Sequence, residues 1–347
     1  MDSTLLTGPK HARLEQRAFQ RADDIAADSL GSILYITRND ARRSTVEDNW
    51  AASHDSLRLR AETLDAVVRE WYEHLHGPVQ PLSGQLNRRL AEYALDRTTA
   101  ETDGALSGEP ASAALADSFS SRFSLFDDAG VGTAEALAAE FEGSALDDRI
   151  ARATVDAYRH YGDLHADYVD EWVCTRGEMF DAVATADQSL STLSPELDVV
   201  ILSGYHEFRP VERRLIERLV DELPMIALLP LHQGGRCGVD AVATDALDVY
   251  ESLDFETVAV EPADDSGKTF GTITEALYRP EPDTVPAPDA LRWRELPTPE
   301  REIRFVAREL RTELANGRDP DDLAVVIPGT EAYSGYVEDT FDTFDIP

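Results

Sequence analysis

The pattern of apolar and polar residues predicts strands and helices that alternate along the chain. Short apolar runs that predict buried strands lie at residues 3–7, 32–37, 197–202, 225–229 and 255–260. Amphipathic segments that predict helices follow them at residues 11–27, 211–222 and 241–253. Such alternation is typical of parallel strands covered by helices, so the sequence predicts an α/β fold.

A long helical stretch interrupts this pattern. Residues 56–76 and 82–97 have helical periodicity, and the chain then turns to Ala, Ser, Gly and acidic residues before helical segments resume. The sequence therefore predicts one α/β domain made of residues 1–97 and 191–278. An α-helical insertion at residues 98–190 separates its two parts.

A proline-rich linker at residues 279–290 ends this domain. Beyond it, residues 291–347 predict strands at 291–295 and 323–327 and helices at 299–316 and 330–344. Two strands do not make a stable sheet alone. We therefore expect residues 291–347 to be the beginning of a second α/β domain, either a fragment or a module that leans on the first domain.

The chain of 347 residues carries 32 basic and 67 acidic side chains, a net charge of −35, and its only lysines are Lys10 and Lys268. Such a charge repels polyphosphates at ordinary ionic strength. In molar salt the Debye length falls to about 3 Å and the repulsion is screened. We interpret the charge as adaptation to salt rather than as an acidic recognition surface, so it says little about partners.

The sequence also lacks the residue patterns of a metal site, of a signal sequence and of a membrane span. Cys174 and Cys237 form no CxxC pair, and His74 and His76 lack a third ligand, so no metal site is predicted. The first residues contain no signal sequence, and the longest apolar run, 225–231, is too short to span a bilayer. We expect a soluble, cytoplasmic protein without a membrane partner.

Neither lysine stands in the sequence pattern of a nuclease site or of a nucleotide-binding loop. A PD-(D/E)XK nuclease needs an acid two residues before its lysine, and neither lysine has one. The sequence Gly267-Lys268-Thr269 lacks the upstream glycine of a phosphate-binding loop and predicts a solvated loop.

Gly8 follows the first strand as the first glycine of a phosphate-binding loop does. The three signature positions that follow hold Arg13, Leu14 and Glu15, in place of glycine, lysine and a hydroxyl residue. Gly8, Lys10 and Arg13 remain a candidate anion site at a helix N-terminus. We predict no catalytic residue and no ATP or Mg²⁺ cofactor.

Two other strand ends carry polar residues. The strand at 197–202 ends in Ser203, where a Walker B strand has the acid that holds Mg²⁺. The second strand ends in Thr37, Arg38 and Asn39, and Arg42 follows them. These side chains suit a nucleic-acid backbone, and the carboxyl edge of a parallel sheet is where such folds bind ligands. The alternative is a helix cap formed by Asn39 or Asp40.

Four segments together resemble one family. They are Gly8-Pro9 after the first strand, the stretch from Ile36 to Ala41, the stretch from Val200 to Glu212, and the region from Glu300 to Pro347. They resemble the UvrD-type superfamily 1 helicase fold and, more closely, the AddB/RexB subunit of helicase–nucleases and its RecC-type inactivated relatives. Gly204, Tyr205, Phe208, Pro210 and Glu212 match the family's Gly-Phe and Phe-Thr-Pro-x-Glu pattern. The resemblance implies a RecA-like parallel sheet with helices on both faces, covering nearly the whole chain.

The resemblance also implies a P-loop lysine, a Walker B acid and an arginine after residues 323–327. This chain has Leu14, Ser203 and Pro328 at those positions. The three losses favour a non-catalytic, helicase-like scaffold for DNA double-strand-break end processing.

Thr37, Arg38 and Asn39 match the family's segment that contacts single-stranded DNA, and we add Arg42 to this predicted site. Trp293 or Tyr205 are candidates for stacking on bases. The expected partners are DNA, single-stranded or at its ends, and a partner helicase or nuclease subunit. The alternatives are an active helicase–nuclease whose nuclease domain lies beyond residue 347, and an interaction platform without DNA affinity.

Overall fold

The computed structural model describes most of the chain. The described residues are 3–8, 13–26, 31–54, 58–101, 113–170, 172–230, 246–260, 294–320, 323–327, 333–344 and 346. They fall into two compact units, Met1–Val285 and Pro286–Pro347. Each unit is described by itself. The predicted linker at 279–290, together with Lys10, Cys237, Lys268, Trp293 and Pro328, lies outside the described residues.

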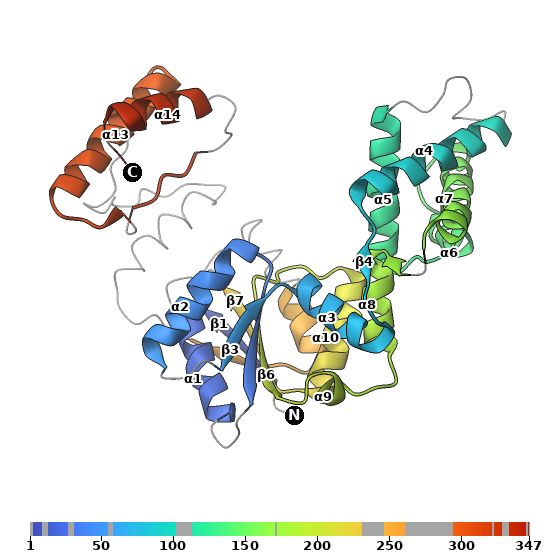
Figure 1. Cartoon of the computed structure of the whole chain (residues 1–347), viewed down its shortest axis with the longest axis horizontal. Coiled ribbons are helices and arrows are strands. Elements are labelled where there is room, and N and C mark those ends of the chain that lie inside the picture. Colours follow the sequence, from blue (N-terminus) through green and yellow to red (C-terminus); the bar gives the residue numbers. More distant parts are fainter. Residues whose placement is uncertain are drawn as a thin grey trace. The chain divides into compact units, whose positions relative to one another are not determined.

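A six-stranded sheet forms the centre of the first unit (Figure 1). Its strands are β1 (Thr4–Gly8), β2 (Ser32–Thr37), β3 (Leu59–Glu62), β6 (Leu197–Ser203), β7 (Met225–Pro230) and β8 (Glu256–Ala259). Their order is β3-β2-β6-β7-β1-β8, and every neighbouring pair is parallel. β7 alone thus separates β1, which leads to the glycine loop, from β6, which ends at Ser203.

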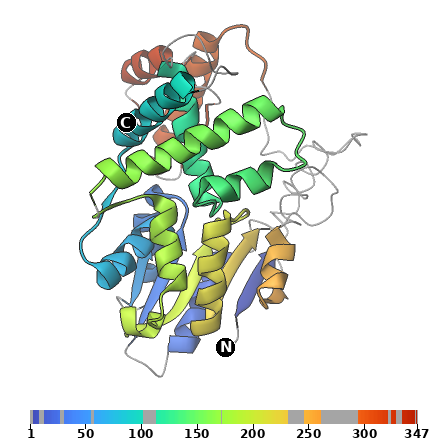
Figure 2. The same ribbon diagram turned by 90° about the vertical axis from the view of Figure 1, so that its right-hand side faces the viewer.

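Helices cover both faces of this sheet (Figures 1 and 2). On one face lie α1 (Leu14–Ala26) and α2 (Arg43–Ser53), which follows the short 3₁₀ turn η1 (Asp40–Arg42). On the other face lie α3 (Leu64–His76), α8 (Arg176–Thr185), α9 (Leu190–Leu193) and α10 (Pro210–Glu222). Side chains of β2 alternate between the two cores: Leu34 and Ile36 pack on one, Tyr35 on the other. The predicted α/β fold is confirmed, and the sheet is consistent with a RecA-like fold.

One element of this sheet was not predicted. Residues 59–62 were assigned to a helix that runs from 56 to 76, and that assignment is wrong, because they form β3 at the edge of the sheet. The helix begins only at Leu64, after Thr63 caps it by accepting a hydrogen bond from the Ala66 N–H. β3 is short and its sequence, LRAE, consists of good helix formers, so pattern alone favours the wrong state.

Four helices form a separate apolar cluster above the carboxyl edge of the sheet (Figure 2). They are α4 (Gly84–Glu101), α5 (Ala113–Asp128), α6 (Ala134–Phe141) and α7 (Asp148–Tyr168). A two-stranded parallel ladder of β4 (Gln80–Pro81) and β5 (Val173–Cys174) joins this cluster to the rest of the unit. The cluster spans Leu82 to Val169, whereas the predicted insertion ran from 98 to 190. The difference arises because α4 packs against α5 and α7, while α8 and α9 belong to the core of the sheet.

The second unit contains two helices that pack together, α13 (Pro299–Ala315) and α14 (Ser334–Thr343). Thr298 caps α13, and Pro299 occupies its first turn, where a missing N–H costs nothing. The predicted strand at 323–327 is not present, because these residues pair with no strand among those described. An extended segment needs a neighbour for its backbone N–H and C=O groups. In neither unit is a described helix long and apolar enough to cross a bilayer.

Candidate functional site

The carboxyl edge of the sheet brings the polar strand ends together. Thr37 of β2 is in register with Ser203 of β6, and Gly8 of β1 is in register with Pro230 of β7. The loops after β1, β2 and β6 therefore start from one edge, where parallel sheets of this kind bind ligands.

The residue directly before α1 has a backbone conformation typical of glycine although it is an arginine. Arg13 stands where the last loop glycine is expected, and its φ of 54° lies in the left-handed region that glycine tolerates and other residues avoid. α1 begins directly after it, with the Arg17 N–H donating to the Arg13 carbonyl at 3.1 Å. Gly8 ends β1 as predicted. The third residue of the candidate anion site, Lys10, lies outside the described residues.

A carboxylate stands at the position of the Mg²⁺-binding hydroxyl. Glu15, in the first turn of α1, accepts hydrogen bonds from Arg42 Nη2 at 2.7 Å, Tyr35 Oη at 2.9 Å and Asn49 Nδ2 at 3.1 Å. Burial, and then the charge of Glu15, raises the pKa of Tyr35. A hydrogen-bonded network of Glu15, Arg42, Asn49 and Tyr35 thus connects the first turn of α1 to β2, η1 and α2.

Two residues of the predicted DNA-contacting segment have capping roles. The Thr37 side chain is buried and its hydroxyl accepts from the Asn39 N–H at 3.3 Å. Asn39 caps η1 by accepting from the Ala41 N–H at 3.0 Å. The cap formed by Asn39, which the sequence left as an alternative, is therefore present, and the exposed Asn39 side chain keeps its amide N–H groups on the surface.

Arg38 lies on the ring of Tyr205, with its guanidinium carbon 4.7 Å from the ring centroid. Its Nη2 donates to the Glu207 carbonyl and to Glu212 Oε2, the latter at 3.2 Å. The side chain is 40% exposed, and that of Arg42 is 51% exposed. Tyr205 is only 2% exposed and is also stacked on Phe208, so it offers no open face for a base. The suggestion that Tyr205 stacks on bases is therefore wrong.

An ion-pair network that sequence reasoning missed surrounds the buried carboxylates of Glu212 and Asp128. Arg176, near the N-terminus of α8, donates to Glu212 Oε1 and Asp128 Oδ1, both at 2.8 Å, and to Asp65 at 2.5 Å. Arg209 pairs with the other oxygen of Asp128. We call Arg38, Glu212, Arg176, Asp128, Arg209 and Asp65 the arginine network. It connects the end of β2 to the helical cluster through residues far apart in sequence, which is why no local motif predicted it.

Metal ligation has no support at this edge or elsewhere in the described parts of the chain, where no three His, Cys, Asp or Glu side chains gather closely enough to hold an ion. Comparison with protein-family models finds no match, and a search of curated proteins finds none either. The resemblance to helicase–nuclease subunits therefore rests on the residues quoted above and on the sheet they form.

Proposed function

We propose that this chain is a non-catalytic, helicase-like DNA-binding scaffold in a helicase–nuclease system for DNA double-strand-break end processing. The non-catalytic part of the proposal rests on one observation. Glu15 occupies the position of the Mg²⁺-binding hydroxyl, and Arg42, Tyr35 and Asn49 hold its carboxylate there. The ion pair with Arg42 occupies the position with protein groups, so no hydroxyl is there for Mg²⁺, and Leu14 supplies no ammonium for a phosphate.

The location and the exposure of Arg38 and Arg42 support the DNA-binding part. Both follow β2 at the carboxyl edge of the sheet, and about half of each side chain is accessible. Each uses one guanidinium nitrogen, Nη2, for its carboxylate. A guanidinium has five N–H donors in total, so donors remain for a DNA phosphate. Base reading is not part of the proposal, because phosphate contacts position DNA without reading its sequence.

Fluorescence anisotropy of labelled single-stranded and blunt duplex DNA in molar KCl tests the proposal. We expect binding that is unchanged by Mg-ATP and lost in the Arg38→Ala/Asn39→Ala double variant. Arg69→Ala is a matched control, because Arg69 is 50% exposed and paired with Glu73, like the site arginines, but lies on α3. For single-stranded DNA, the slope of log K against log salt is negative, and each lost phosphate contact reduces its magnitude by about 0.7.

Three other outcomes would contradict part of the proposal. Hydrolysis of ATP by the isolated chain contradicts the non-catalytic assignment and favours an active helicase. A folded chain that binds neither DNA refutes the DNA-binding part and favours the interaction platform, in which Arg38 and Arg42 serve only their internal ion pairs. Equal loss of binding in Arg69→Ala indicates a general charge effect rather than a site.

A further inference from the structure

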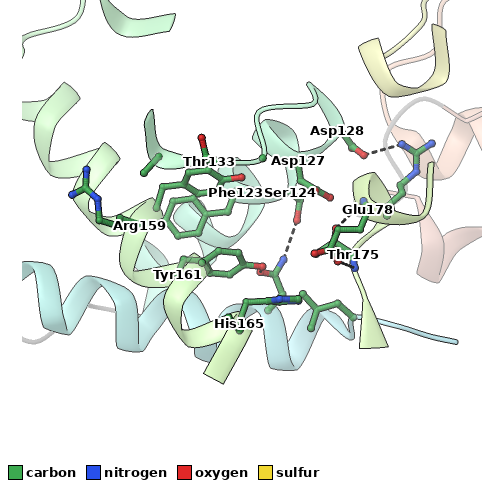
Figure 3. A pocket seen from close by; sticks show the side chains of 18 of the residues that line it. Phe123, Ser124, Asp127, Asp128, Thr133, Arg159, Tyr161, His165, Thr175 and Glu178 are labelled. Atoms are coloured by element: carbon green, nitrogen blue, oxygen red, sulfur yellow. Dashed lines mark hydrogen bonds and ion pairs between the residues drawn. The ribbon is translucent and has the colours of Figure 1, made fainter. Parts of the chain in front are cut away.

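A pocket of about 800 Å³ opens between the helical cluster and the N-terminus of α8 (Figure 3). Phe123 of α5 and Tyr161 of α7 lie on one side of it, and Thr175 and Glu178 lie on the opposite side. Neither Glu15 nor the residues from Thr37 to Arg42 line it, so the pocket is separate from the proposed DNA site.

The aromatic side is a packed group of three rings. The ring centroid of Phe123 lies 4.8 Å from that of Tyr161 and 5.3 Å from that of Tyr158. Both phenol hydroxyls are already used: Tyr161 donates to Asn87 Oδ1 at 2.9 Å and Tyr158 to the Val131 carbonyl at 2.6 Å. The rings are only 1–8% exposed and both hydroxyls are used, so they form an apolar wall of the pocket and offer neither an open ring face nor a hydrogen bond.

The charges of the pocket are unequal, with five carboxylates and three guanidiniums among its lining residues. Each guanidinium is paired with a carboxylate: Arg176 and Arg209 share Asp128, and Arg159 pairs with Asp156 at 2.7 Å. Three lining carboxylates are left without an arginine or histidine partner among the described residues, and they are those of Asp127, Asp163 and Glu178.

Two of these carboxylates are held firmly at the start of α8. Asp127 Oδ2 accepts from the Gly177 N–H at 2.7 Å, an approach that requires glycine, because a Cβ at that position would lie 2.4 Å from Asp127 Cγ. Glu178 accepts from the Thr175 N–H at 2.7 Å in a capping box. The carboxylates are thus oriented by backbone donors but have no cation beside them.

The surrounding groups respond to this negative charge. Burial raises the pKa of Asp127, and the charges of Glu178 and Asp128 add to that shift. Burial, then the charges of Asp127 and Glu178, raises the pKa of Tyr158 to about 12. Burial is the larger cause of both pKa shifts, and the smaller contributions from Glu178, Asp127 and Asp128 show that carboxylates face these groups, which favours a cation over an anion.

One lining side chain has an unmet hydrogen bond. The Nε2 atom of His165, on the last turn of α7, is buried and has no hydrogen-bond partner in the described part of the chain. Most buried polar atoms are paired, and an unpaired one in a native structure calls for an explanation. Because Nε2 itself is buried, a ligand that carries N–H groups reaches it only after the His165 side chain turns toward the pocket that it lines.

We propose that this pocket binds an organic cation, a guanidinium or ammonium group on an apolar stem, with the stem against the wall formed by Phe123, Tyr158 and Tyr161 and the charged end at the carboxylates of Asp127 and Glu178. The charged end gains a carboxylate partner, and the stem covers apolar surface. A bare metal ion fits less well, because no metal-ligand cluster is found among the described residues. Asp127 is partly buried, so molar salt screens its charge less than that of an exposed carboxylate such as Glu178.

Isothermal titration calorimetry of the full chain with arginine amide tests this proposal. Both ligands have their α-amino group acetylated, so that citrulline amide has nearly the same shape without any charge, and we expect it not to bind. Asp127→Asn and Glu178→Gln keep acceptors for the backbone donors, and each should weaken arginine amide at least about tenfold. Asp181→Asn is the control, because Asp181 also lies on α8 but pairs with Arg214 outside the pocket, and it should leave the affinity unchanged.

The same chemistry has two sources, an arginine side chain of a partner protein or a free polyamine, and a parallel titration with spermidine distinguishes them. If a carboxylate variant fails to fold, two further measurements test the proposal. They are the affinity of Asp163→Asn, a variant on the surface of α7, and the shift of the His165 imidazole resonances during titration of the wild type. Equal binding of citrulline amide, or no binding of either cation by the folded wild type, overturns the proposal.

Discussion

Replacement of Arg176 by methionine removes the centre of the arginine network and keeps most of the side-chain volume. Asp128 and Glu212 have side chains only 8% and 6% exposed, so both depend on their cationic partners. Removal of one partner from a buried ion pair costs about 3–5 kcal/mol. Here Arg209 remains beside Asp128 and Arg38 beside Glu212, which reduces the loss. The exposed pair with Asp65 adds at most about 1 kcal/mol.

We therefore expect Arg176→Met to lower the free energy of unfolding by about 2–3 kcal/mol. Urea denaturation in molar KCl measures it, with Arg213→Met as the control, because Arg213 is 45% exposed and pairs only within its own helix and with Ser252. The control should change by less than about 0.5 kcal/mol. A loss below about 1 kcal/mol in Arg176→Met, or equal losses in both variants, would refute the reasoning that the buried carboxylates need Arg176.

Two further predictions concern stability. Arg13→Gly should stabilise the protein by about 0.5–1 kcal/mol in urea denaturation, because glycine relieves the left-handed backbone at a smaller entropic cost; a destabilised variant would contradict this. Burial acts to raise the pKa of Glu222, but hydrogen bonds from Arg218 and from the Leu190 N–H outweigh it, so the folded pKa lies below the usual value. This stabilisation is present above the unfolded pKa and is lost as the pH falls through the folded pKa. Glu222→Gln should therefore lower the melting temperature at neutral pH and converge with the wild type in acid, and a constant difference across pH would exclude this linkage.

The parts of the fold that the sequence predicted share a physical cause. β2, β6 and β7 are buried on both faces, so each is a continuous apolar run that is visible without any knowledge of its neighbours. β3 lies at the edge, half exposed and only four residues long, and its pattern resembled a helix. The segment 323–327 shows the opposite error, because its apolar residues read as a strand but no described strand pairs with them.

The sequence also indicated only part of the candidate site, namely which residues lie at the edge of the sheet and not which side chains meet there. The positions of Gly8, Thr37 and Ser203 at one edge follow from the topology of parallel strands. The engagement of Glu15 by Arg42 and Asn49 depends on how α1 packs beside α2, and residue spacing alone does not specify that contact. The partners of Arg176 are 36, 48 and 111 residues away in sequence.

The sequence by itself determined the class of the fold and the absence of the nucleotide-site residues, because strand burial and residue identity are local properties. Only the tertiary structure decided what replaces that site, which carboxylates have an arginine beside them, and where a pocket forms. Charge pairing and cavities depend on distances between elements that are far apart in the chain. Those distances are fixed by how α5, α7 and α8 pack, which no single stretch of residues encodes.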